Sequence, residues 1–140
     1  MERIKEFGLH FGLLWLRFFM GAGIAYHGYG KIFGGMMPRF TQGVAQMGFP
    51  TPELFAWAAA LSEFMGGIFI IIGFLTRPAA FFVFFTMSVA AFITHSADPL
   101  NVKEMALAYW VMASALMLTG PGKFSIDRRV EVALTGNEEE

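Results

Sequence analysis

Two long apolar segments of this chain each carry one charged residue near the middle. Arg17 interrupts residues 9–26, and Glu63 interrupts residues 54–74. About 20 apolar residues in a helix are long enough to cross the hydrocarbon core of a bilayer. A charged side chain at the centre of such a helix costs roughly 2.5–3.5 kcal/mol on insertion scales. We therefore expect Arg17 and Glu63 to meet inside a bundle of helices as an intramembrane ion pair.

The composition indicates an integral membrane protein whose main partner is the lipid bilayer. Of the 140 residues, 56% are hydrophobic and 15% are charged, whereas soluble domains carry about 25% charged residues. The net charge of −1 and the lack of a basic stripe do not indicate a nucleic-acid partner. The chain has no cysteine, which excludes thiol catalysis and cysteine-bound iron–sulfur clusters.

The apolar segments predict an all-α, polytopic fold: an antiparallel bundle of four transmembrane helices within residues 1–122. The expected spans lie near residues 9–26, 54–74, 78–94 and 104–118. Residues 123–140 are expected to form a polar C-terminal tail that begins as a short surface helix. Four spans place both termini on the same side of the membrane.

The distribution of Lys and Arg predicts which side that is. The side with the termini carries six basic residues (Arg3, Lys5, Arg77, Lys123, Arg128 and Arg129), and the other side carries three (Lys31, Arg39 and Lys103). Loops rich in Lys and Arg stay in the cytoplasm. We therefore expect both termini of this multi-pass protein to be cytoplasmic.

Small residues surround Glu63 at helical spacing, among them Ala59, Ala60 and Gly67. Small faces are where transmembrane helices approach closely, so Glu63 is expected to point into a helix–helix contact. Two interpretations of the Arg17–Glu63 pair stay open. It is either a structural pair that sets the helix register, or a functional gate, proton relay or anchor for a polar ligand.

A second group of polar residues lies at the predicted outer ends of the spans. It comprises His27, Tyr29, Lys31, His95, Asp98 and Glu104. Together these side chains could bind an anion, donate hydrogen bonds to a quinone head group or relay protons. Alternatively, they are interfacial caps and snorkelling side chains. No metal-ligand spacing and no nucleotide-binding glycine motif accompanies them, so neither a metal nor a nucleotide is predicted.

Five short motifs in order resemble the DoxX family of membrane proteins. They are Arg17-Phe-Phe-Met-Gly21, His27-Gly-Tyr-Gly-Lys31, Gly48-Phe-Pro, Glu63-Phe-Met-Gly-Gly67 and Gly73-Phe-Leu-Thr-Arg-Pro78. The resemblance covers residues 13–120. It implies a four-helix protein of the prokaryotic cytoplasmic membrane, and some members resemble small subunits of thiosulfate:quinone oxidoreductases. Arg17, His27, Lys31 and Glu63 match the recurring pattern, but no catalytic role transfers to them.

The resemblance thus favours a membrane subunit or partner of a quinone-linked, thiosulfate-type oxidoreductase. A quinone would bind near the outer group, His27 or His95 would exchange protons, and Lys31 would attract an anionic sulfur substrate. Since the sequence shows no electron carrier of its own, electron transfer would need either a quinone bound directly or a redox partner protein that carries the cofactor.

Two alternatives stay open. A non-enzymatic scaffold or assembly factor would use small-residue faces such as Gly8/Gly12 to associate with other helices. A small transporter would use Arg17 and Glu63 to line a polar path, and four short helices would then need a homo-oligomer to enclose it.

Overall fold

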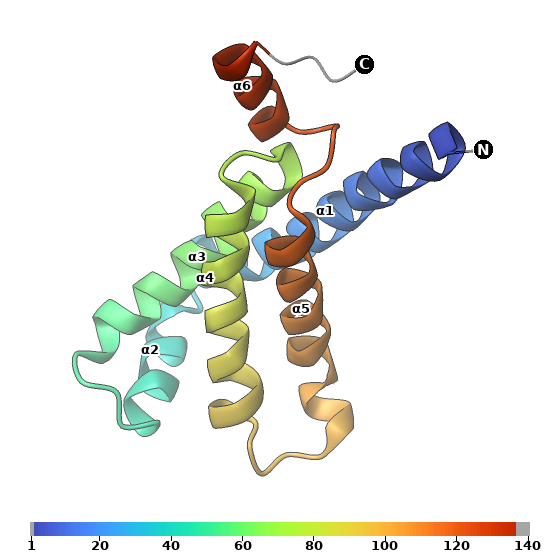
Figure 1. The fold of residues 1–140 in the computed structure, drawn as a ribbon. Coiled ribbons are helices and arrows are strands. Elements are labelled where there is room, and N and C mark those ends of the chain that lie inside the picture. Colours follow the sequence, from blue (N-terminus) through green and yellow to red (C-terminus); the bar gives the residue numbers. More distant parts are fainter. Residues whose placement is uncertain (1, 137–140) are drawn as a thin grey trace.

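The computed structural model describes residues 2–136, which fold into helices and contain no strand (Figure 1). The helices are α1 (Glu2–Phe33), α2 (Met37–Gln46), α3 (Pro52–Ile72), α4 (Thr76–Val89), the π-helical turn η1 (Ala90–Thr94), α5 (Leu100–Thr119) and α6 (Ile126–Thr135). Four helical stretches are long and apolar enough to cross a membrane: α1, α3, α4 with η1, and α5. The predicted all-α bundle with four membrane-spanning helices is confirmed.

The four long helices pack in the order in which they occur in the chain. α3 packs along α1, α4 packs against α3, and α5 packs against α4. Figure 1 shows α4 and α5 side by side, with α1 crossing the bundle obliquely and its N-terminal turns extending beyond it. The short helix α2 lies beside the start of α3. The start of α6 is attached to the turn between α3 and α4, because the Asp127 amide donates to the Gly73 carbonyl at 2.8 Å.

Glycine residues bring the backbones of α1 and α3 into direct contact. A Cβ atom added to Gly21 would lie 2.6 Å from the carbonyl oxygen of Gly67, and one added to Gly67 would lie 2.6 Å from the Gly21 oxygen. A Cβ on Gly28 would collide with the backbone of Phe64. Such close approach is typical of transmembrane helix pairs and holds α1 and α3 in one register.

Most of the interior of the bundle is apolar, and much of its outer surface is apolar as well. Met20, Ile24 and Ile70 are almost fully buried between the helices, whereas large side chains elsewhere on the same helices are exposed. A protein in lipid needs no polar exterior, so this surface agrees with membrane insertion. One interior polar contact joins α4 to α5: the indole nitrogen of Trp110 donates to the Ser88 hydroxyl at 2.9 Å.

The observed helices differ from the predicted spans at several ends. α1 extends seven residues before and after residues 9–26, and α5 begins at Leu100 rather than at residue 104. Hydropathy marks where a helix is apolar, whereas helical hydrogen bonds continue through its polar first and last turns. α6 occupies the expected position of the C-terminal surface helix. The last part of the predicted polar tail, residues 137–140, lies outside the described residues.

Candidate functional site

Glu63 is the most deeply buried acidic side chain among the described residues. It is 2% exposed in the middle of α3, and both of its carboxylate oxygens accept hydrogen bonds from the Lys31 ammonium at 2.6 Å. The Lys31 side chain, from the last turn of α1, is 19% exposed. Removal of either partner would leave the other charge unpaired and poorly solvated, so each residue stabilises the charged form of the other in this position.

The predicted ion pair between Arg17 and Glu63 is wrong. Both side chains are buried as expected, but Arg17 has other partners. Its guanidinium donates to the carbonyl oxygen of Ile71 at 3.3 Å and also to the carbonyl oxygen of Phe124. The Arg17 Nε atom is buried and has no hydrogen-bond partner within residues 2–136. Glu63 is paired with Lys31 instead.

The register of α1 against α3 explains why Glu63 pairs with Lys31 and not with Arg17. Gly28 of α1 packs against Phe64 of α3, so Glu63 lies opposite the last turns of α1. Arg17 is eleven residues before Gly28, which corresponds to about 16 Å along a helix axis at 1.5 Å per residue. Lys31 is three residues after Gly28, and its four-carbon side chain reaches the carboxylate. The similar positions of Arg17 and Glu63 within their apolar segments did not reflect similar depths.

Arg17 instead connects three segments at the other end of the bundle. Beyond Ile71 and Phe124, it interacts electrostatically with Asp127 at the start of α6. Space for its guanidinium comes from Gly73, where any Cβ would collide with Arg17. Gly73 has a φ of 71°, which a glycine adopts without strain. Arg17 is therefore a structural anchor for the turn after α3 and for the segment that leads into α6.

A pocket of about 250 Å³ lies beside the Lys31–Glu63 pair. Its walls come from the end of α1, from α2, from α3 and from α4 with η1, and they are mostly apolar. Apart from the pair itself, the lining residues include Phe40, Val44, Met47, Phe49, Phe55, Ala59, Phe82, Phe85 and Thr94. Convergence of a few polar groups at one end of an apolar pocket is the usual arrangement of a small-molecule site. This pocket, with Lys31 and Glu63 at its polar end, is the candidate functional site.

Helix α2 forms one wall of this pocket, although it lies outside the expected spans, between residues 9–26 and 54–74. Phe40, Val44 and Met47 are spaced to lie on one face of a helix, and all three line the pocket. The Phe40 ring also lies 4.2 Å from the Lys31 Nζ atom, within cation–π range. Glycines around the segment obscured it, but Pro38 at the start of a helix and the apolar spacing were readable signals.

Two members of the predicted outer group lie near the pair without lining the pocket. The His27 ring packs edge-on against the Tyr109 ring of α5, with centroids 6.1 Å apart, and His27 interacts electrostatically with Glu63. Tyr29 packs against Phe33 and Phe64, with ring centroids 5.1 and 6.3 Å away.

The remaining three members lie at or after the connection between η1 and α5. His95 Nδ1 and the Asp98 carboxylate are 2.7 Å apart, and both side chains are more than a third exposed. Glu104 is exposed on α5. Of the six residues in the predicted outer group, only Lys31 lines the pocket. Their shared position at span ends did not bring them to one site, because three of them are on or near a loop that extends beyond the bundle (Figure 1).

Comparisons with known proteins find a family and two membrane proteins that this sequence resembles. The sequence model of the DoxX family matches residues 12–96. The inner membrane protein YphA of Escherichia coli (strain K12) is 36% identical over 97 residues, which cover 63% of this chain and 69% of YphA. The inner membrane protein YqjF of the same organism is 34% identical over 106 residues, which cover 72% of this chain and 78% of YqjF. No solved structure matches the chain.

Proposed function

Because the chain belongs to the DoxX family and is a multi-pass inner membrane protein, we propose that it binds a membrane quinone as a subunit of a quinone-linked oxidoreductase. The observation that carries this proposal is the apolar pocket whose inner end holds the buried Lys31–Glu63 pair. In this proposal the pocket receives the head group of the quinone, and the isoprenoid tail runs outward among the helices into lipid.

The size and lining of the pocket fit such a head group. A volume of about 250 Å³ is below the range of pockets that enclose whole drug-sized ligands. It suits one substituted ring whose tail stays outside. The rings of Phe40, Phe55 and Phe85 are available to pack against the faces and edges of a flat ring.

The polar end of the pocket fits the chemistry of quinone carbonyl oxygens. A Lys ammonium has three N–H donors, and the contacts with Glu63 use two of them. The third can donate to a carbonyl oxygen, while the Glu63 carboxylate can hold a proton close to the same oxygen. Because His95 does not line the pocket, we assign the head-group contact to Lys31.

The chain supplies binding and proton exchange in this proposal, and a partner redox protein supplies the electrons. A quinone that is reduced to a quinol takes up two electrons and two protons. The sequence has no cysteine with which to bind an iron–sulfur cluster. The thiosulfate-type substrate that the family resemblance implies would therefore react on the partner.

Retention of quinone by a variant with a filled pocket tests the binding step. Ala59 lines the pocket, and Ala59→Phe would place a ring inside it. Ala108, an exposed residue of α5 that does not line the pocket, provides the matched control Ala108→Phe. Quinone extracted from protein purified in mild detergent is measured by liquid chromatography and mass spectrometry. We expect at least a tenfold loss for Ala59→Phe and none for Ala108→Phe. Equal retention in both variants, with both folded, would refute the pocket assignment.

Identification of co-purifying proteins tests the partner. Native membranes are solubilised mildly, and everything recovered with the chain is identified by mass spectrometry. A redox enzyme recovered together with quinone is the expected result. Recovery of neither would contradict the proposal and would favour the scaffold or the small transporter.

A further inference from the structure

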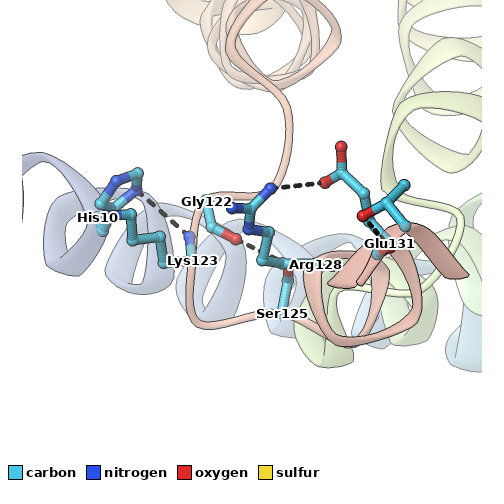
Figure 2. Close-up of polar contacts among 7 residues, drawn as sticks. His10, Gly122, Lys123, Ser125, Arg128 and Glu131 are labelled. Atoms are coloured by element: carbon cyan, nitrogen blue, oxygen red, sulfur yellow. Dashed lines mark hydrogen bonds and ion pairs between the residues drawn. The ribbon is translucent and has the colours of Figure 1, made fainter. Parts of the chain in front are cut away.

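A second and larger cavity, of about 590 Å³, lies at the opposite end of the bundle from α2. The N-terminal part of α1, the start of α4, the end of α5 and helix α6 surround it. Figure 2 shows part of its wall, where the Lys123 amide donates to His10 Nδ1 at 3.3 Å and Arg128 pairs with Glu131 at 3.0 Å. Nine of the 14 residues that line it are charged or polar, whereas the pocket beside Lys31 and Glu63 is mostly apolar.

The three carboxylates in the cavity wall are all engaged. Glu6 pairs with Lys123, and Glu131 pairs with Arg128. Asp127 accepts hydrogen bonds from two backbone amides at the start of α4, that of the preceding residue Leu75 at 2.7 Å and that of Thr76 at 2.9 Å. The electrostatic interaction between Asp127 and the buried Arg17 adds a further cation behind this wall.

Arg77 is the lining cation that no carboxylate neutralises within residues 2–136. Its guanidinium packs over Gly120, where a Cβ would lie 3.4 Å from two of its nitrogens. Beside it, the Thr76 hydroxyl is buried and finds no hydrogen-bond partner in the part of the chain that the structure describes. Among the described residues, the cavity wall therefore has one guanidinium without a carboxylate partner, packed against backbone, and one hydroxyl without a hydrogen-bond partner.

The cavity lies at the level where lipid head groups are expected. Thr76 begins one candidate span and Thr119 ends another, and both residues line the cavity. This end of the bundle also carries the six basic residues that predict a cytoplasmic location. Basic pockets between transmembrane helices on the cytoplasmic side bind acidic lipid head groups.

From these observations we propose that this cavity binds a phosphate-type oxyanion through Arg77, and that its source is the head group of an anionic phospholipid of the inner leaflet. Acyl chains would descend along the exposed apolar side chains of Leu75 and Leu118. This site is independent of the quinone pocket, so either proposal can fail without the other.

Native mass spectrometry of the full chain in detergent tests the site. Phosphatidylglycerol and phosphatidylcholine with identical acyl chains are titrated separately, and apparent dissociation constants are compared. We expect the unmodified chain to prefer phosphatidylglycerol. Arg77→Gln should reduce that preference about fivefold, the contribution of one cation near an anionic surface. The control is Arg39→Gln, at an exposed arginine of α2 that does not line the cavity.

The remaining outcomes separate the sources of the anion. Thermal unfolding confirms that each variant is folded, and inorganic phosphate is compared with chloride at equal ionic strength. Stabilisation by phosphate that depends on Arg77, without a lipid preference, would keep the oxyanion site but replace the lipid with a free anion. An equal loss in the Arg77 and Arg39 variants would overturn the proposal. A chain that neither prefers phosphatidylglycerol nor is stabilised by phosphate would overturn it as well.

Discussion

The Lys31 ammonium of α1 lies 2.6 Å from both carboxylate oxygens of Glu63 on α3. The contact joins the last turn of one helix to the middle of another, and it borders an apolar pocket. An ion pair in this position is expensive to break, because each charge would lose its counter-ion without gaining full hydration. Because the pair is held in place at the edge of an apolar pocket, it is also a suitable polar end for a ligand site.

The pair predicts an asymmetry between single and double substitutions. Glu63→Gln should lower the free energy of unfolding by about 3 kcal/mol, the typical loss when one partner of a buried pair is removed. Lys31→Met combined with Glu63→Leu should recover much of this loss, because no buried charge remains. Unfolding in mixed detergent micelles, followed by circular dichroism, measures both. A double variant less stable than Glu63→Gln would contradict the account.

Arg17 and Glu63 are predicted to be energetically independent. Residues that are well separated and share no partner give additive effects within about 0.5 kcal/mol. A double-mutant cycle with Arg17→Met and Glu63→Leu should therefore show no coupling, whereas the cycle with Lys31→Met should show more than about 1 kcal/mol. Comparable coupling in the two cycles would mean that Arg17 and Glu63 do interact.

The helix contact at Gly67 predicts a strong effect of one methyl group. Gly67→Ala should cost about 1–3 kcal/mol, the range for overpacking, because the new Cβ would meet the backbone of α1. Gly12→Ala is the matched control: Gly12 is helical and a Cβ there meets nothing within 4 Å. Since alanine favours a helix over glycine, Gly12→Ala should be neutral or slightly stabilising. Equal unfolding free energies for the two variants would disprove the close approach.

The cap that Asp127 provides predicts a local loosening of α6. Asp127→Asn should cost about 1 kcal/mol, because an ionised acceptor of two backbone amides at the start of α4 is replaced by a neutral one. Hydrogen exchange of residues 126–135 should become faster. Asp98→Asn, in the exposed loop after η1, is the control and should leave α6 unchanged. Unaltered exchange in the Asp127 variant would argue against this attachment.

The distribution of basic residues predicts the topology, which single cysteines can report because the chain has none of its own. Ala97→Cys and Thr135→Cys introduce exposed thiols in the connection before α5 and in α6. A membrane-impermeant maleimide should label the thiol at position 97 in intact spheroplasts and the thiol at position 135 only after lysis. The reverse pattern would place the termini outside the cytoplasm.

Much of the architecture could be read from the sequence because bilayer insertion depends on local composition. Four apolar stretches of sufficient length predicted four helices in the right places, and five ordered motifs pointed to the family. The burial of Arg17 and Glu63 was also predictable, because neither charge is tolerated in lipid. The short helix α2 was missed because the glycines in and around it obscured its apolar face, although Pro38 and the apolar spacing were readable signals.

By itself, the sequence determined the number of spans, the helical class and the set of charges that must be hidden from lipid. Only the tertiary structure decided which charges meet. Backbone contact at Gly21 and Gly67 holds α1 and α3 in a register that places Lys31, and not Arg17, beside Glu63. The physical reason is that membrane insertion depends on the composition of each segment alone. Which charged residues pair depends instead on the axial offset between two helices, and small residues set that offset where the two backbones touch.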